Sequence, residues 1–384
     1  MSFNSFNWDG ILAAYGEIAI KSDIVRRRFV KCLMNNIIEG LSGTGKVKVI
    51  HKWSRILIDV EDIPRAVNVL SKIFGIVYFA PYKFVNLNSL EDFIRNNCSS
   101  LLEDAESFAV RVRRKGKHVF TSRDLEAKLG KIVKENLDLN VSLENPDKTL
   151  YVEIKGNDCY IYNSRIQGPG GLPLGTAGRV VSLISGGIDS PVAAWMLMKR
   201  GCTIIPLFAY FPKNDDSMLK RFLKVISILK EWHIGFELPI YLFRHEHNLE
   251  VFMNSAPKYT CILCKRMMYR VANFLAEKVN ADAIATGENL AQVASQTLKN
   301  LRVIDQASRL PVLRPLIGFD KDEIVALARK IGTFTASSMN IGGCWAKPSK
   351  PITRAKFSEI IKIEEKLNVD KLLEESVRSL TRIM

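Results

Sequence analysis

The sequence predicts an α/β protein in which two small units precede one large domain with a doubly wound parallel sheet. Three observations indicate this architecture: strand and helix patterns alternate along the 384 residues, a Gly/Pro-rich joint interrupts them at residues 167–175, and the strands after the joint are continuous apolar runs. A chain of this length usually forms two or three domains. We therefore expect units at residues 1–75 and 76–167, a linker at 168–175 and the large domain at 176–384.

The first unit alternates short helix and strand patterns. Helices are expected at residues 26–39 and 63–74, and strands at 47–50 and 55–60. Phe29, Leu33 and Ile37 follow one another at intervals of four residues, and with Ile38 they are expected to form one apolar face of the first helix. Pro64 is tolerated because it falls in the first turn of its helix. This element order is typical of a small ferredoxin-like α+β domain.

The second unit is expected to bind a partner or to act as a scaffold. Its pattern predicts a helix, a strand, a second helix and then a hairpin, at residues 90–103, 107–112, 122–137, and 149–155 with 159–163. Ser122 is the expected cap of the second helix. Neither small unit carries a set of residues typical of catalysis.

The joint is the clearest boundary in the chain, because four Gly and two Pro in nine residues cannot continue a helix or a central strand. After it, strands are expected at residues 179–184, 203–211, 236–243 and 282–286, and helices at 190–200, 218–232 and 261–278. Apolar strands that alternate with helices indicate a parallel sheet covered on both faces. In such sheets, ligands bind at the carboxyl ends of the strands.

The composition favours a polyanionic partner and excludes several other classes of protein. The chain has 55 Lys and Arg against 40 Asp and Glu, a net charge of +15. A solvated basic surface is the alternative. Seven cysteines, an odd number, argue against a disulfide scaffold and for a reducing cytoplasm. The N-terminus lacks the pattern of a secretory signal and no apolar run has membrane-spanning length, so we expect a cytoplasmic protein without a membrane partner.

The sharpest motif is Ser185-Gly-Gly-Ile-Asp-Ser190, here called the 185–190 loop, which lies between an apolar strand and a helix. Gly186 and Gly187 let backbone amides approach an anion, and the two serines add hydroxyl donors. The helix N-terminus supplies a partial positive charge, so a pyrophosphate group fits this loop. Asp189 is then placed to hold Mg²⁺ beside the phosphates. The alternative is a plain strand-to-helix turn with a serine cap.

A second glycine-rich segment, Gly40-Leu-Ser-Gly-Thr-Gly-Lys46, matches only the first part of a nucleotide-binding P-loop. Val47 stands where the Mg²⁺-binding Ser or Thr is required, and a helix rather than a strand precedes the segment. We interpret it as a helix-to-strand loop.

The 185–190 loop resembles the signature of the PP-loop ATP pyrophosphatases, a superfamily whose members cleave ATP between its α- and β-phosphates. Three further segments follow in order, at residues 261–270, 285–297 and 343–348. With the two N-terminal units, the whole chain resembles the tRNA 4-thiouridine synthetases, in which a ferredoxin-like domain and a THUMP domain precede the PP-loop domain. The resemblance implies ATP- and Mg²⁺-dependent adenylation of the uridine at position 8 of tRNA and replacement of its O4 by sulfur. Sulfur supply for thiamine biosynthesis is a further role in many members.

The resemblance and the loop chemistry together identify an expected ATP site. By resemblance its residues are Leu183, Ile184, Phe208, Lys265, Gly287 and Gln296, and from the loop they are Ser185, Gly186, Gly187, Asp189 and Ser190. Arg266 joins Lys265 near a helix start, where an anionic ligand or a plain salt bridge would each explain two cations. Gln292 lies one helical turn before Gln296, so both could face the sheet edge, although a solvated helix face is the favoured interpretation of the pair taken alone.

The seven cysteines divide into two groups. Four stand in apolar or mixed stretches and are expected to be small core residues: Cys32, Cys98, Cys159 and Cys202. Cys261 and Cys264 lie three residues apart near a helix N-terminus, which favours thiolate, and Cys344 follows Gly342 and Gly343 in a loop that leaves its sulfur accessible.

Three interpretations of the cysteine trio stay open. A [4Fe–4S] cluster on Cys261, Cys264 and Cys344 would leave one iron free to bind sulfide. A persulfide on Cys344 would make that residue catalytic, and a zinc or purely structural site is the third option, with His245 and His247 as unremarkable candidates for a further ligand. The chain is expected to be a short form without the rhodanese-like domain of many relatives. Its sulfur would then come from a cysteine desulfurase or another donor, and a thiamine-pathway carrier protein and a homodimer are further expected partnerships.

Two basic runs are expected to bind RNA. The first is Lys21, Arg26, Arg27 and Arg28, and the second is Arg111, Arg113, Arg114, Lys115 and Lys117. A solvated charged face is the alternative for each run. Two other functions are alternatives. The first is a nitrogen-inserting PP-loop ligase, which the THUMP-like region and the cysteine trio disfavour. The second is an RNA-binding scaffold with a degenerate nucleotide site, which the intact loop disfavours. A THUMP methyltransferase is disfavoured because the large domain opens on a PP-loop.

Overall fold

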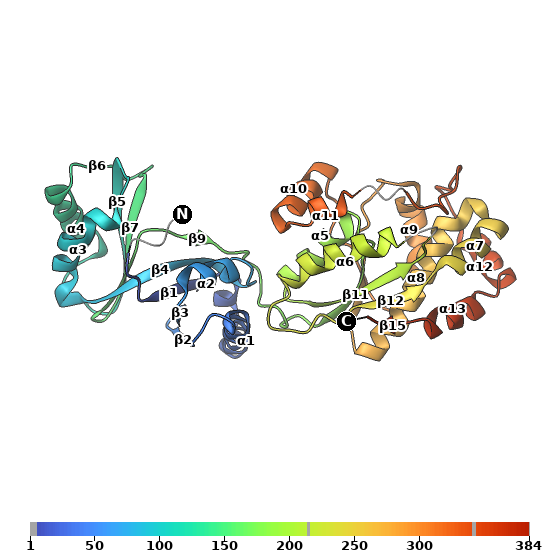
Figure 1. Cartoon of the computed structure of the whole chain (residues 1–384), viewed down its shortest axis with the longest axis horizontal. Coiled ribbons are helices and arrows are strands. Elements are labelled where there is room, and N and C mark those ends of the chain that lie inside the picture. Colours follow the sequence, from blue (N-terminus) through green and yellow to red (C-terminus); the bar gives the residue numbers. More distant parts are fainter. Residues whose placement is uncertain (1–5, 213–215, 340–342, 384) are drawn as a thin grey trace. The chain divides into compact units, whose positions relative to one another are not determined.

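The computed structural model describes residues 6–212, 216–339 and 343–383, and the chain forms two compact units, Met1–Gly171 and Leu172–Met384 (Figure 1). The elements of the first unit are β1 (Gly10–Tyr15), α1 (Asp23–Leu41), β2 (Val47–Lys52), β3 (Arg55–Val60), α2 (Ile63–Leu70), β4 (Ile76–Asn86), α3 (Leu90–Leu101), β5 (Ser107–Lys115), α4 (Ser122–Asn136), β6 (Asn140–Val141), β7 (Lys148–Lys155), β8 (Asp158–Tyr162) and β9 (Ile166–Gln167).

One long strand, β4, joins the two halves of the first unit into a single sheet. Its first part pairs with β1 and its last four residues pair with β8, in the order β2-β3-β1-β4-β8-β7-β5-β6, with β9 also paired to β4. Strand β4 is not predicted from the sequence, because Pro81 within it and the Tyr and Lys residues around it interrupt the apolar pattern. The two halves of the first unit, each of which carries one of the two basic runs, therefore belong to one hydrogen-bonded sheet.

Local details of the first unit correct two expectations. Ile38 is 42% exposed, and Asn36 takes the buried position next to Ile37 on α1. The cap of α4 is Thr121 rather than Ser122: the Asp124 amide donates to the Thr121 hydroxyl at 3.2 Å, and the Thr121 amide donates to the Asp124 carboxylate at 2.8 Å. This reciprocal capping box satisfies two backbone amides that the helix itself leaves unpaired.

A buried ion pair also ties the two halves of the first unit together. The Arg55 Nη2 on β3 donates to the Glu153 Oε1 on β7 at 2.9 Å, and both side chains are under 10% exposed. The Tyr162 hydroxyl donates to the same carboxylate oxygen at 3.0 Å. Arg165 stacks over the ring of Tyr151, with its guanidinium carbon 3.9 Å from the ring centroid.

The second unit is built on a sheet with the order β14-β13-β10-β11-β12-β15, parallel except for β15. Its elements are β10 (Arg179–Leu183), α5 (Asp189–Lys199), β11 (Thr203–Tyr210), α6 (Ser217–Lys230), β12 (Tyr241–Arg244), α7 (Glu246–Ser255), α8 (Thr260–Val279), β13 (Ala283–Ala285), α9 (Leu298–Asp305), β14 (Val312–Leu313), α10 (Lys321–Ile331), α11 (Phe334–Ser337), α12 (Phe357–Lys366), α13 (Val369–Arg378) and β15 (Thr381–Arg382). This is the predicted doubly wound architecture.

Helices cover both faces of this sheet, as Figure 1 shows. Val181 of β10 packs into a core with α8 and its neighbours, whereas Val180 faces Leu197 of α5 on the other side. The chain leaves β10 toward β11 in one direction and reaches β13 in the other, so a topological switch point lies at the carboxyl ends of β10 and β13. No helix in the described part of the chain combines the length and apolar character needed to cross a bilayer.

Prediction for the first unit: Glu153→Gln leaves the Arg55 charge buried without a counterion, and should lower the free energy of unfolding by about 3 kcal/mol. Amide hydrogen exchange of β3 and β7 in the full chain measures this loss. Glu135→Gln, which removes an exposed partner of Lys131, is the control and should change stability by less than about 0.5 kcal/mol. Adding Arg55→Met to Glu153→Gln should recover part of the loss. Equal protection in the two single variants would contradict the prediction.

Candidate active site

The 185–190 loop lies at the carboxyl end of β10, and its backbone amides contact the hydroxyl groups of its own two serines. The Ser185 amide donates to the Ser190 hydroxyl at 3.1 Å, and the Gly187 amide lies 3.4 Å from the Ser185 hydroxyl oxygen. Gly186 has a φ of +74°, and a Cβ at this position would lie 3.2 Å from the backbone of Phe222. Helix α5 begins directly at Asp189, so its N-terminus points its free amides at the loop.

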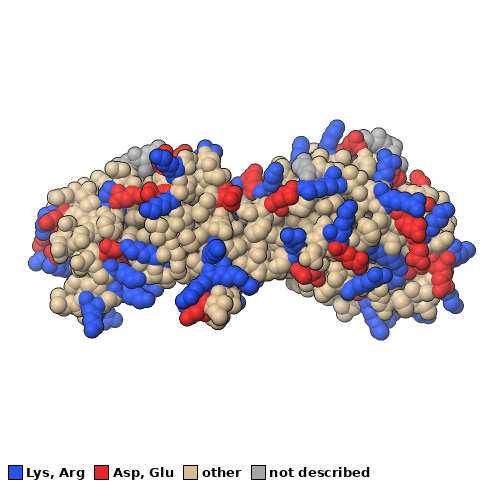
Figure 2. Space-filling model, turned by 90° about the horizontal axis from the view of Figure 1, so that it is seen from below, with Lys and Arg blue, Asp and Glu red and all other residues tan. Residues whose placement is uncertain are grey.

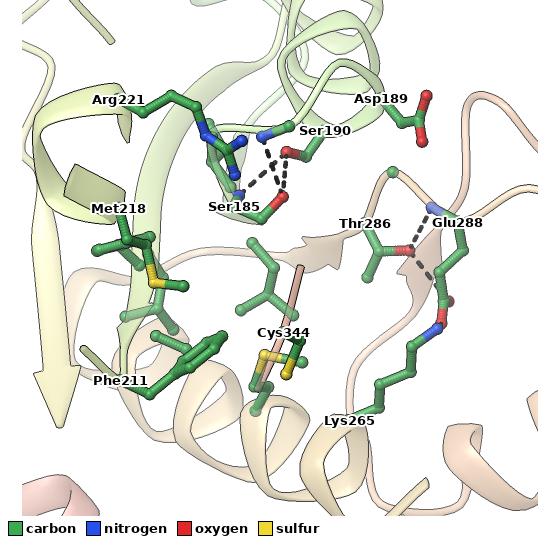
Figure 3. A pocket seen from close by; sticks show the side chains of 18 of the residues that line it. Ser185, Asp189, Ser190, Phe211, Met218, Arg221, Lys265, Thr286, Glu288 and Cys344 are labelled. Atoms are coloured by element: carbon green, nitrogen blue, oxygen red, sulfur yellow. Dashed lines mark hydrogen bonds and ion pairs between the residues drawn. The ribbon is translucent and has the colours of Figure 1, made fainter. Parts of the chain in front are cut away.

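A cavity of about 910 Å³ opens over this loop (Figure 3). Ten of the twelve residues expected to bind ATP line it: Leu183, Ile184, Ser185, Gly187, Asp189, Ser190, Phe208, Lys265, Gly287 and Gln296. The lining also includes Met218, Arg221, Thr286 and Glu288, which the sequence analysis did not identify. Both apolar walls and convergent polar groups are therefore present, as is typical of a nucleotide site.

The two remaining residues of the expected set do not line the cavity. Gly186 lies on the side of the loop that packs against the backbone of Phe222. Arg266 is 1% exposed, and its Nε and Nη2 each donate to the Glu364 carboxylate at 2.7 Å. The salt bridge, rather than an anionic ligand, accounts for this arginine. Its partner lies on α12, nearly a hundred residues away, so no local signal could reveal it.

Asp189 has a cationic partner that the sequence analysis also missed. Its Oδ1 accepts from the Lys321 Nζ at 2.5 Å, and its Oδ2 accepts from the Gln292 Nε2 at 3.3 Å. Gln292 and Gln296 are not one turn apart on a helix: they lie in a loop that ends in a short 3₁₀ turn at Ala294–Gln296. Gln292 faces Asp189, and Gln296 lines the cavity.

Glu288 organises the opposite wall of the cavity. Burial by itself would raise the pKa of this carboxyl group, but Lys265 and Arg314 lower it to about 2. The Lys265 Nζ, the Arg314 Nε and the Tyr269 hydroxyl each donate to it at 2.7 Å. Lys265 is thereby held at the cavity edge with its charge neutralised. Figure 3 shows the Lys265 and Glu288 side chains directed at each other.

The three cysteines of interest lie close to one another at the floor of the same region. Cys344 lines the cavity, and Cys261 and Cys264 lie on the first turns of α8. The Cys264 Sγ is 3.2 Å from the Nε2 of the fully buried His245. Burial, and then the proximity of the other thiols, raises the pKa of Cys261 and Cys264, so the expected stabilisation of thiolate by the helix N-terminus is wrong for the isolated chain.

The other cysteines behave largely as predicted. Cys98, Cys159 and Cys202 are buried, and Cys32 is partly buried. Cys344 is exposed, and Gly342 before it lies outside the described residues. Within the part of the chain that the structure describes, no three His, Cys, Asp or Glu side chains are arranged to hold a single metal ion.

The two basic runs lie on the first unit. Arg27 and Arg28 are exposed on α1, as are Arg113, Lys115 and Lys117 at or just beyond the end of β5. Lys21, Arg26, Arg111 and Arg114 are partly buried, and Arg111 and Arg26 bond to Leu143 and Asp23. Figure 2 shows that blue Lys and Arg side chains predominate over red acidic ones on the visible face of this unit.

Comparisons with known proteins cover every part of the chain described so far. Residues 10–80 match the ThiI ferredoxin-like domain, 85–163 the THUMP domain and 175–369 the thiamine biosynthesis protein (ThiI) model. The probable tRNA sulfurtransferase of Methanothermobacter thermautotrophicus is 41% identical over 98% of this chain and 99% of its own length. The corresponding protein of Saccharolobus solfataricus is 40% identical over 95% of this chain and 98% of its own length. The chain belongs to the ThiI family of tRNA sulfurtransferases.

A solved structure supports the same assignment for this sulfurtransferase. A 4-thiouridine synthetase in complex with RNA and with bound ATP matches with a TM-score of 0.88 and 32% identity, over 98% of this chain and 99% of that one. The predicted fold class is confirmed, with ferredoxin-like, THUMP and PP-loop parts in the expected order. The THUMP match begins inside β4, the strand that both halves of the first unit of this ThiI-family chain share.

Prediction for the sulfurtransferase site: Gly287→Ala should weaken ATP binding about tenfold or more. A Cβ at residue 287 would lie 2.6 Å from the Ser190 backbone nitrogen and 2.9 Å from the Asp189 carbonyl carbon, so the loop would have to shift. Gly318→Ala, where no heavy atom lies within 4 Å of the added Cβ, is the matched control. Calorimetric titration of both variants with ATP measures the effect. Wild-type affinity in Gly287→Ala would refute the assigned backbone contact.

Proposed function

We propose that this enzyme uses ATP to adenylate the uridine at position 8 of tRNA and then replaces its O4 with sulfur, giving 4-thiouridine. One observation supports the proposal above all others: Cys344 lines the same cavity as the 185–190 loop. A group that binds pyrophosphate and a group that can deliver sulfur thus open onto one space. The RNA and ATP bound to the solved relative are consistent with both substrates.

ATP is proposed to bind with its phosphates on the 185–190 loop. The Gly187 amide, the serine hydroxyls and the N-terminus of α5 would bind the phosphate oxygens. Asp189 is the carboxylate proposed to hold Mg²⁺. Its oxygens suit this ion, it is 25% exposed and it lines the cavity. When bound, Mg²⁺ would neutralise phosphate charge, and Lys321 adds a second positive charge at the same carboxylate.

The proposed first step forms a bond between the uracil O4 and the α-phosphorus. The bond from that phosphorus to the bridging oxygen breaks, pyrophosphate leaves with the electron pair, and the N3 proton of uracil passes to solvent. In the second step a sulfur nucleophile forms a bond to C4 and AMP leaves with O4. Adenylation converts a poor leaving group into a good one, which makes the ring carbon open to attack.

The sulfur is proposed to reach the cavity through the cysteine trio. Cys261 and Cys344 lie close enough to Cys264 to raise the pKa of its thiol, and three neighbouring thiols suit a [4Fe–4S] cluster on Cys261, Cys264 and Cys344. Such a cluster would supply sulfide at its open iron. The alternative is a persulfide on Cys344, the exposed member of the trio, loaded by a cysteine desulfurase or another donor. Attack of its outer sulfur on C4 would leave a disulfide between that sulfur and Cys344. A further thiol would then attack the Cys344 sulfur, form a disulfide with it and release 4-thiouridine.

The first unit is proposed to bind the tRNA. Its exposed basic residues would contact phosphates, and recognition would depend on the shape and backbone of the RNA, because an RNA duplex hides its bases. The target uridine would have to leave its stack to enter the cavity. Sulfur transfer to a carrier protein of thiamine biosynthesis is a further proposed role, which the name of the family model suggests.

Prediction for the reaction: wild type should form AMP, pyrophosphate and 4-thiouridine from ATP, tRNA and a sulfide source. Asp189→Ala should lower tRNA-dependent pyrophosphate release about a hundredfold, because it removes the carboxylate proposed to hold Mg²⁺ beside the phosphates. Cys344→Ser should retain pyrophosphate release but lose thiolation. Pyrophosphate release and absorbance of 4-thiouridine in recovered tRNA measure the two steps. Pyrophosphate release at the wild-type rate in Asp189→Ala would show that the assignment of Asp189 is wrong.

Prediction for the sulfur site: anaerobically reconstituted wild type should bind about four iron and four sulfide per chain. Cys264→Ala should lose most of this iron, whereas Cys202→Ala, which removes a buried cysteine elsewhere in the same unit, should keep it. Iron and acid-labile sulfide analysis measures both. Absence of iron from the reconstituted wild type would exclude the cluster and leave the Cys344 persulfide.

A further inference from the structure

Arg221, on the second turn of α6, is a cation at the cavity wall that no sequence motif indicated. It lines the cavity together with Ser185 and Gly187. Figure 3 shows its guanidinium group turned toward Ser185 and Ser190, whereas Cys344 lies at the other side of the cavity. Arg221 therefore belongs to the phosphate end of the site and not to the sulfur end.

Arg221 is only partly buried, and it lacks the carboxylate partner that buried Arg266 has in this unit. Its Nη1 donates to the Met339 carbonyl oxygen at 3.3 Å, and its buried Nε has no hydrogen-bond partner. Among the described residues no Asp or Glu pairs with it, and burial alone lowers the pKa of its guanidinium group. By contrast, Glu364 neutralises Arg266 and Glu288 neutralises Arg314. A cation placed this way is costly unless an anion completes it.

The geometry of Gly186 brings Arg221 against the loop. A Cβ at residue 186 would lie 3.5 Å from the Arg221 Nε and 3.2 Å from the Phe222 backbone nitrogen. Only a glycine at this position, with its φ of +74°, lets the loop backbone lie so close to the guanidinium group. An anion bound by the loop amides would therefore also meet Arg221.

We infer that Arg221 binds the β- and γ-phosphates of ATP and stabilises the pyrophosphate that leaves during adenylation. This inference rests on the proposed function. As the bond between the α-phosphorus and the bridging oxygen breaks, the electron pair moves onto pyrophosphate, and negative charge grows beside the loop. A fixed guanidinium group at that position stabilises the transition state more than the ground state. It does not take part in the displacement of AMP by sulfur.

The test compares ligands with and without the β- and γ-phosphates. Arg221→Met should weaken binding of the ATP analogue with a methylene group between its α- and β-phosphorus at least about tenfold, and leave binding of AMP within about twofold. Pyrophosphate release with tRNA at saturating ATP should fall about a hundredfold. Arg221→Lys should recover part of both losses. Because the wild-type cation is unpaired, the melting temperature of Arg221→Met should equal or exceed that of wild type.

Lys224→Met is the matched control. Lys224 lies one turn further along α6, is exposed, and contacts the same Met339, but does not line the cavity. It should behave as wild type in all four measurements. Equal weakening of AMP and analogue binding in Arg221→Met, or no weakening of either, would overturn the inference. Wild type that binds neither ligand would overturn the proposed function itself, so the two failures are distinguishable.

Discussion

The backbone contact between Gly287 and the first turn of α5 is the constraint on which the rest of the site depends. The strands β10 and β13 are neighbours, and the loops that follow them meet at the switch point of the sheet. At residue 287 there is no room for a Cβ, because the Ser190 backbone is 2.6 Å from where it would lie. The 185–190 loop is thus in close contact with Gly287 on one side and with Phe222 beside Gly186 on the other.

The cations around this loop fall into two kinds. Lys265, Arg266 and Arg314 are neutralised by buried carboxylates, which hold their side chains in one position but leave little charge for a ligand. Arg221 is not neutralised in this way by any residue that the structure describes. The same distinction applies in the first unit. Glu153 neutralises Arg55, and this ion pair links the two halves of the sheet. The exposed arginines of α1 and β5 are free to contact a polyanion.

Sequence reasoning worked where a short segment determines its own structure. The 185–190 loop and the apolar strands were identified because their signals lie within a few residues. Predictions from the sequence were wrong where tertiary packing outweighed a weak local preference. The N-terminus of α8 favours a thiolate by less than about 1 kcal/mol, and burial of Cys264 outweighs it. Gln292 and Gln296 were expected on a helix, but they lie in a loop, and this loop places Gln292 against Asp189.

The sequence by itself determined the order of the three parts and identified the 185–190 loop, which lines the cavity. Only the tertiary structure decided which charges are neutralised and which face the cavity. The reason is distance along the chain: Glu364 reaches Arg266, and Glu153 reaches Arg55, each across 98 residues. A local pattern shows that a cation is present, but the partner that neutralises it is chosen by packing. The sequence drew attention to Arg266 and not to Arg221, yet the fold pairs Arg266 with Glu364 and places Arg221 at the cavity wall beside the 185–190 loop.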